Sequence, residues 1–149
     1  VSKPEAPLTF YEESNAFKLF LLDCGLLGAM NMTDATEAML TDNIFEEYNG
    51  ALTEQLVLQE LKCVPNLPVY YYTKPNSQQE IDFLIDIKNC AIPVEAKAGE
   101  NLQAKSLKQF ILENKSEKAI KTSLKQYKSN EIIDNIPLYA LYCYLQEWL

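Results

Sequence analysis

Two adjacent segments with strand-like alternation constrain the fold more than any other feature of this sequence. In residues 80–87 apolar side chains stand at every second position, which is the period at which strand side chains share one face. Residues 91–98 read as a second strand, and Lys88 and Asn89 are left for the turn between them. The sequence therefore predicts an antiparallel β-hairpin. The alternating residues of its first strand are Ile81, Phe83, Ile85 and Ile87.

The segments around the hairpin predict one mixed α/β domain. A chain of 149 residues, 48% of them apolar, is long enough for one well-buried core and short for two. Before the hairpin we expect a helix over 51–62 and a strand over 69–73. After it we expect a helix over 101–113, a short strand over 119–124 and a buried final helix that opens at Pro137.

The N-terminal part is less regular. Residues 1–16 are polar and acidic with two prolines, so they are predicted to be a linker, and the domain is predicted to span 17–149. The apolar run 17–30 suggests a buried connecting element, whose type the pattern leaves open. The spacing of Asp34 and Glu37 is that of a capping box and predicts a short helix.

The absence of two residue types narrows the chemistry. There is no histidine, which excludes Ser-His-Asp and Cys-His nucleophilic sites and any imidazole ligand, so a bound metal would have to meet oxygen. All thirteen basic residues are lysines, so guanidinium forks for phosphate are missing as well. The four cysteines have no CxxC spacing and indicate neither a zinc site nor a disulfide framework.

No segment of the sequence is predicted to enter a membrane. The longest apolar stretch, residues 138–145, is less than half of the ~20 residues that a membrane-spanning helix needs. The first residues show no basic region followed by an apolar one, so we expect no secretory signal. These features predict a cytoplasmic protein without membrane contact.

The charge of the chain is negative overall but unevenly distributed. A net charge of -8 argues against nucleic-acid binding by the whole surface, because phosphate attraction depends on clustered positive charge. Residues 97–128, however, hold eight of the thirteen lysines, Lys105 and Lys108 among them. These lysines could contact a phosphate backbone, or they could form an ordinary solvated surface.

The predicted hairpin brings carboxylates together. With the turn at 88–89, Asp82 lies directly opposite Glu95, and Glu80 lies opposite Lys97. Like charges across a strand pair are destabilising, so this register needs a compensating cation, and a divalent metal ion suits an all-oxygen pair. The alternative is that this face is simply solvated, with Lys97 neutralising its neighbours.

A third carboxylate stands on the helix that precedes the strands. Glu54 follows the helical spacing of Val57, Leu58 and Leu61, which places it on the apolar face. Because burying an unpaired carboxylate costs several kcal/mol, Glu54 should point at a cation or a donor near the sheet. Alternatively, Glu54 lies near the helix N-terminus and only favours the helix dipole. The polar side of the helix is assigned to Gln55, Gln59 and Lys62.

A glycine-containing segment after the second hairpin strand resembles a phosphate-binding loop but departs from it. Residues 99–106 (GENLQAKS) follow a strand and open a helix, yet Ala104 stands where the second glycine is needed. A methyl group there obstructs a backbone that has to wrap phosphate. Nucleotide binding within this chain is therefore not favoured.

These residues carry a family resemblance. Residues 80–85 (EIDFLI) and 93–99 (PVEAKAG) resemble the D...(D/E)-x-K signature of the PD-(D/E)XK nuclease superfamily, and residues 50–61 (GALTEQLVLQEL) resemble its first helix. Together with residues 17–27 (FKLFLLDCGLL), the chain looks like the uncharacterised C-terminal domain of prokaryotic AAA-type ATPases. One departure is that the Pro-Asp dipeptide of the superfamily name is Ile81-Asp82 here.

The resemblance implies a fold and a set of site residues. The fold would be a restriction-endonuclease-like, three-layer core with a mixed central sheet flanked by helices. Asp82 and Glu95 would coordinate Mg²⁺ or Mn²⁺, the Ala96 carbonyl would complete the ligand set, and Glu54 would bind a second ion or orient a metal-bound water. Lys97 would position or deprotonate the attacking water. Glu80 matches an auxiliary acid of the family.

The function implied is phosphodiester hydrolysis of DNA or RNA by a module of a larger ATPase, with residues 1–16 leading in from the ATPase. The alternative is a noncatalytic interaction or regulatory module of the ATPase that keeps the nuclease fold, because one fold can carry unrelated functions.

Overall fold

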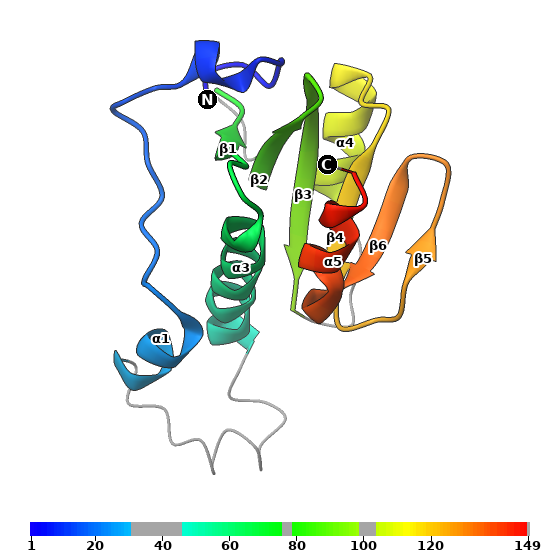
Figure 1. Cartoon of the computed structure of the whole chain (residues 1–149). Helices are drawn as coiled ribbons and strands as arrows, with labels where there is room; N and C mark the ends of the chain where they lie inside the picture. Colours follow the sequence, from blue (N-terminus) through cyan, green and yellow to red (C-terminus); the bar gives the residue numbers. More distant parts are fainter. Residues whose placement is uncertain (31–45, 76–78, 99–103, 149) are drawn as a thin grey trace.

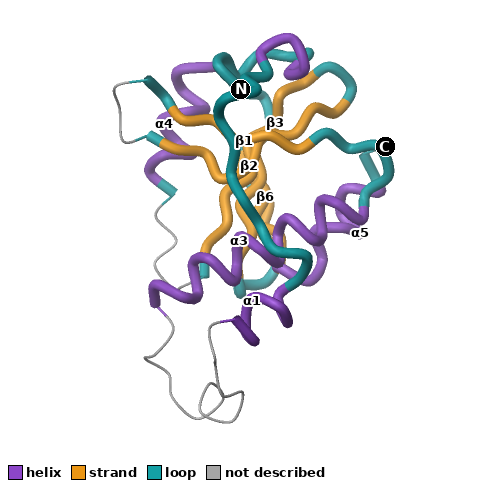
Figure 2. The backbone as a smooth tube through the Cα atoms, turned by 90° about the vertical axis from the view of Figure 1, so that its left-hand side faces the viewer, coloured by secondary structure: helices purple, strands orange, loops and turns teal. Residues whose placement is uncertain are grey.

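The computed structural model describes residues 1–30, 46–75, 79–98 and 104–148, and in them a mixed six-stranded sheet has helices on both faces (Figures 1 and 2). The strand order is β1-β2-β3-β4-β6-β5. Helices α3 and α5 pack on one face and α4 on the other. The predicted α/β class, with a mixed sheet flanked by helices, is confirmed. The strands are β1 Val69–Thr73, β2 Glu80–Ile87, β3 Cys90–Lys97, β4 Ala119–Ser123, β5 Lys128–Ser129 and β6 Ile133–Pro137; the α-helices are α1 Cys24–Met30, α3 Glu46–Cys63, α4 Lys105–Asn114 and α5 Leu141–Gln146.

The predicted hairpin is present with the predicted register. Strands β2 and β3 pair antiparallel from Phe83 opposite Val94 to the turn. Lys88 and Asn89 form that turn with φ of 52° and 62°, and this left-handed pair matches the twist of the flanking strands. The pattern of turn and strands therefore fixes which residues of β2 and β3 face one another.

The second half of the sheet is parallel. Strand β4 pairs parallel to β3, and β6 pairs parallel to β4. Helix α4 is the crossover between β3 and β4. The prediction missed β5 and β6, because β6 places the polar Asp134 and Asn135 in its centre. Pro137 ends β6, and the predicted final helix follows as the turn Leu138–Ala140 and α5.

Strand β2 does not keep the simple alternation that the sequence suggested. Phe83 and Ile85 pack with α3 and α5, whereas Ile81 packs with α4. The register with β1 explains the difference, since Tyr70 pairs with Leu84 but Tyr72 pairs with Ile81. Residues 82 and 83 thus face one residue of β1, which makes a β-bulge. Bulges redirect side chains and occur often beside active sites.

The segment predicted as a linker lies against the domain. Leu8, in the short helix Leu8–Tyr11, is fully buried in the core on the α4 side, and its backbone N–H donates to Asp86 Oδ2 at 3.1 Å. The chain then runs along the outside of α3 to α1 (Figure 1). The helix predicted at Asp34 and Glu37 lies outside the described residues, as do residues 99–103 of the loop discussed above. No helix in the described ranges has the length and apolar character to cross a membrane.

Candidate active site

The bulge in β2 places Asp82 at the centre of a cluster of charged side chains. Asp82 Oδ2 accepts a hydrogen bond from the backbone N–H of Ala96 on β3 at 2.8 Å. Burial, reinforced by the charges of Glu95 and Glu54, raises the pKa of Asp82 to about 7, although the Ala96 hydrogen bond and the charge of Lys18 act in the opposite direction. The ionised form of Asp82 is therefore only partly stabilised by its surroundings, and a further cation would stabilise it.

Glu95 is the most buried acid of the cluster. Its exposure is 4%, and its Oε1 lies 2.6 Å from Lys97 Nζ. The other oxygen, Oε2, is buried and has no hydrogen-bond partner within the described structure. A buried carboxylate oxygen without a partner is costly, so this atom is a position where a ligand would be stabilised.

The cluster contains a cation that the sequence analysis missed. Lys18 Nζ lies 2.5 Å from Glu80 Oε1 and 3.6 Å from Glu54 Oε2, and it sits over the Tyr71 ring at 5.5 Å from the centroid. Burial alone would lower the pKa of Lys18, but the hydrogen bond to Glu80 and the nearby carboxylates raise it. Among the described ion pairs none joins Glu80 to Lys97: Glu80 pairs with Lys18, and Lys97 pairs with Glu95.

Helix α3 holds the segment that carries Lys18. Gln55, which is 2% exposed, accepts from the Leu21 N–H and donates to the Leu21 carbonyl, both at 3.0 Å. Gln59 accepts from the Cys24 N–H at 3.0 Å. The prediction that these glutamines face solvent is wrong, because the N-terminal segment covers that side of α3. The only hint in the sequence was the apolar run around Lys18.

Glu54 has a cationic partner, as expected, and in the described structure that partner is Lys18. The predicted apolar positions Val57 and Leu61 are fully buried in the core. Glu54 itself is about one-third exposed, at 32% of its side chain. Helix α3 fixes the position of Glu54 relative to β3. The charge of Glu54 contributes to the raised pKa of Asp82.

The residues fit one divalent cation held by the two carboxylates of Asp82 and Glu95 better than a site with three carboxylate ligands. In the described ranges no three acidic or cysteine side chains are close enough to hold a metal ion together, so the geometry does not support Glu54 as a third direct ligand. Mg²⁺ characteristically binds through one or two carboxylates and keeps several waters. Asp82, Glu95 with its unpartnered oxygen, and the Ala96 carbonyl provide such an oxygen donor set.

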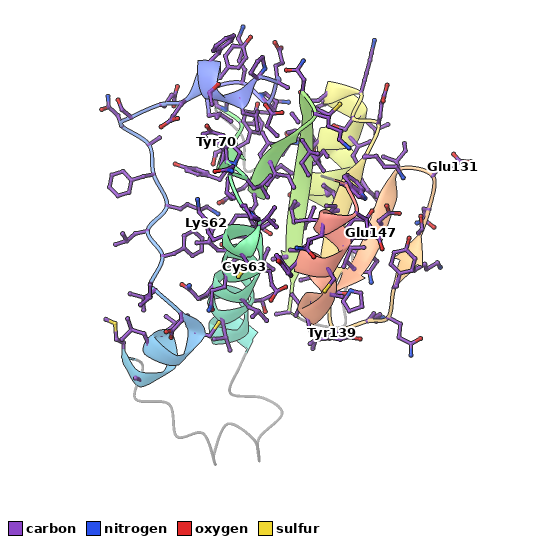
Figure 3. All side chains as sticks on the ribbon, in the orientation of Figure 1. Lys62, Cys63, Tyr70, Glu131, Tyr139 and Glu147 are labelled. Atoms are coloured by element: carbon purple, nitrogen blue, oxygen red, sulfur yellow. The ribbon has the colours of Figure 1, made fainter. Side chains whose placement is uncertain are left out.

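A pocket of about 290 Å³ opens onto Asp82. Lys18, Phe17 and Tyr71 line it together with Tyr70, and Figure 3 shows Tyr70 on β1 beside the N-terminal segment. Burial and the neighbouring Glu12 raise the pKa of the Tyr70 phenol. The N-terminal segment thus forms one wall of the approach to the acid.

The two lysines predicted as phosphate contacts stand on α4. Lys105 is the first residue of that helix and Lys108 lies one turn later, and both are exposed. Neither takes part in a described ion pair.

The fold and the site define a mixed α/β domain with an acidic cluster across an antiparallel strand pair and an adjacent lysine. A family model described as "Domain of unknown function (DUF4143)" matches residues 49–141. This is more than half of the chain, and the chain belongs to that family. Searches of curated proteins and of solved structures gave no match.

Proposed function

We propose that this domain is a metal-dependent nuclease with a restriction-endonuclease-like fold, which hydrolyses phosphodiester bonds of DNA or RNA. The observation that carries the proposal is the buried Glu95, with one oxygen unpartnered and the other bound to Lys97, beside the Asp82 carboxyl. A structural salt bridge would not need the second, uncompensated acid.

Each residue would have a separate task. Asp82, Glu95 and the Ala96 carbonyl would hold Mg²⁺ or Mn²⁺, which when bound supplies charge neutralisation and an acidified water. The Lys97 ammonium would be held by Glu95 at the strand end, where it stabilises charge that develops on the phosphoryl oxygens. The hydrogen bond from Ala96 would fix the orientation of the Asp82 carboxylate.

Glu54, Glu80 and Lys18 would act one step away from the reacting atoms. Lys18 neutralises Glu54 and Glu80 and so reduces the repulsion on Asp82. Lys18 belongs to a segment that packs on α3, so the net charge of the site depends on the position of residues 17–24. In this proposal Glu54 affects the site through its charge.

The alternative function is a noncatalytic interaction or regulatory module. It is favoured by Lys18, because ion pairs with this residue already satisfy two of the acids without a metal. In either case we propose that the domain works in the cytoplasm as part of a larger ATPase, with the ATPase module as its partner. The resemblance of the chain to the C-terminal domain of AAA-type ATPases is the support for the ATPase module as partner.

The test is titration calorimetry with Mn²⁺ on the wild type, Asp82→Asn and the control Glu131→Gln, with thermal melts of all three. Glu131 is exposed in the β5–β6 turn, remote from the site (Figure 3). The proposal predicts binding to the wild type and to Glu131→Gln but not to Asp82→Asn, and Mn²⁺-dependent cleavage that Lys97→Ala abolishes. Folded protein that binds no Mn²⁺ in any form would leave the interaction module as the better conclusion.

A further inference from the structure

A second feature lies on the α4 side of the sheet, where lysines line a hollow. This hollow has a volume of about 800 Å³ and is formed by the end of β4, the following turn and the β5–β6 edge. We call it the lysine hollow, and define it by Lys121, Lys125, Lys128 and Tyr127, which line it. Tyr127 exposes 58% of its surface.

The charges of this region are concentrated and unpaired. Lys121 has its pKa lowered, first by burial and then by the charges of Lys108, Lys125 and Lys128. No ion pair in the described ranges joins any of these four lysines to an acid. Although the net charge of the chain is -8, no described ion pair offsets these lysines, and a surface where positive charge is clustered in this way attracts anions.

The lysine hollow adjoins the candidate active site. Lys121 on β4 is the register partner of Glu95 on β3, and Ser123 is the partner of Lys97. Val94 and Ile120 face α3 and α5, so by alternation Glu95, Lys97 and Lys121 lie on the opposite face, the one that α4 covers. Because β3 and β4 are parallel, Lys97 and the turn after β4 lie at the same edge of the sheet, where α/β proteins bind ligands.

We propose that the lysine hollow binds the phosphate backbone of single-stranded nucleic acid and leads one strand to Lys97. This inference rests on the proposed nuclease function and adds to it the substrate class and the side of approach, which is the β4–β5 edge and not the pocket at Lys18. Lysines bind the backbone, and an exposed ring between them, such as Tyr127, is the kind of platform on which bases stack without sequence preference.

The experiment measures binding of a labelled oligothymidylate, and of a duplex of the same length, in EDTA at low salt. The variant Lys108→Gln/Lys125→Gln/Lys128→Gln removes three exposed charges: two lysines that line the hollow and Lys108 of α4, whose charge acts on Lys121. Its matched control, Lys3→Gln/Lys88→Asn/Lys115→Asn, removes three exposed charges elsewhere; Lys88 and Lys115 have φ of 52° and 51°, where asparagine is tolerated. Circular dichroism confirms that all variants fold.

The proposal predicts about tenfold or greater loss of single-strand affinity for the hollow variant and less than about twofold for the control, with the slope of log K against log salt reduced by about 2. Tyr127→Leu should weaken the single strand about fivefold and leave the duplex unchanged. Replacing the same three lysines with arginine should preserve binding.

Equal losses in the two triple variants would show that only net charge matters and would overturn the hollow as a site. A duplex that binds more tightly than the single strand, with no effect of Tyr127→Leu, would overturn the substrate class. The two proposals separate cleanly: hollow-dependent binding without Mn²⁺-dependent cleavage contradicts the nuclease alone. Cleavage with an unchanged KM in the hollow variant contradicts the hollow alone.

Discussion

At the scale of single residues, the site is organised by charges that are only partly compensated. The charge of Glu95 helps to raise the pKa of Asp82, and one Glu95 oxygen lacks a partner in the described structure. Lys97 pairs with Glu95 and Lys18 pairs with Glu80, so neither of these ion pairs reaches Asp82. The protein therefore holds a carboxyl whose ionised form it does not fully stabilise, which is characteristic of functional sites.

The raised pKa of Asp82 predicts how stability changes with pH in metal-free protein. The folded carboxyl holds its proton up to about pH 7, whereas the unfolded one releases it near its ordinary value of 3.8. The folded state thus binds more protons between these values, and this group's contribution to the free energy of unfolding falls as pH rises through that window and then levels off. We expect urea unfolding in EDTA to show this difference. Between pH 4 and pH 8, the free energy of unfolding of Asp82→Asn should rise relative to that of the wild type by about 1–3 kcal/mol. Glu131→Gln should show no such gain, and a wild type that parallels Asp82→Asn across this range would contradict the prediction.

Lys18 gives a second prediction at this scale. Lys18→Met keeps the length of the side chain but leaves Glu54 and Glu80 without their cation beside Asp82, so we expect a loss of about 1–2 kcal/mol in unfolding free energy at pH 7. The control is Lys3→Met, because Lys3 is exposed over the Tyr11 ring and should cost less than about 0.5 kcal/mol. Chemical unfolding measures both, and equal effects would show that Lys18 is an ordinary surface lysine.

At the scale of elements, the hairpin and its neighbours α3, β1, α4 and β4 were predictable, whereas strand β6 and the contact that brings Lys18 to the site were not. Period and turn residues give β2 and its register with β3, because strand alternation and a two-residue turn are local properties. Lys18 could not be assigned to the site, since its contact with Glu80 depends on how the N-terminal segment crosses α3. Strand β6 could not be predicted either. Its buried Asp134 is stable only with hydrogen-bond and charge partners whose positions depend on the tertiary structure. Local patterns thus predict the strands that carry Asp82 and Glu95, while the cation comes from tertiary packing.

The contact between α3 and the N-terminal segment can be tested at Gln55. Gln55→Leu keeps most of the volume but removes both hydrogen bonds to the Leu21 backbone, leaving partly buried polar groups unpaired at a cost of about 2–3 kcal/mol. Hydrogen exchange at residues 17–24 should become faster than in the wild type, measured by mass spectrometry. Gln59→Leu removes one bond and should have the smaller effect; the reverse order would contradict this role of Gln55.

At the scale of the whole molecule, the sheet has an antiparallel part that carries the acids and a parallel part that a separate polar network ties to α5. Asp134 on β6 is 3% exposed, and it accepts hydrogen bonds from Ser129 of β5 and Tyr144 of α5. Lys118 Nζ lies 3.6 Å from its Oδ2. This network joins β5, β6 and α5 on the side of the sheet away from β2.

The separation of the two parts predicts that stability and metal binding can be uncoupled at Asp134. Burial opposes ionisation of this carboxyl, but the bonds from Ser129 and Tyr144 and the charge of Lys118 outweigh it and lower its pKa. Its contribution is therefore present above the ordinary value of 3.8 and is lost as pH falls through the lower folded value. Asp134→Asn should cost about 1–3 kcal/mol of unfolding free energy at pH 7, with a smaller difference below about pH 4.

Because Asp134 makes no described contact with Asp82 or Glu95, titration calorimetry on folded Asp134→Asn should give the Mn²⁺ affinity of the wild type, whereas Asp82→Asn should lose binding while remaining folded. Loss of Mn²⁺ binding in Asp134→Asn at a temperature where it is fully folded would show that the parallel part of the sheet holds the acids in place. Both the metal site and the approach of a strand from the lysine hollow would then depend on the packing of β6.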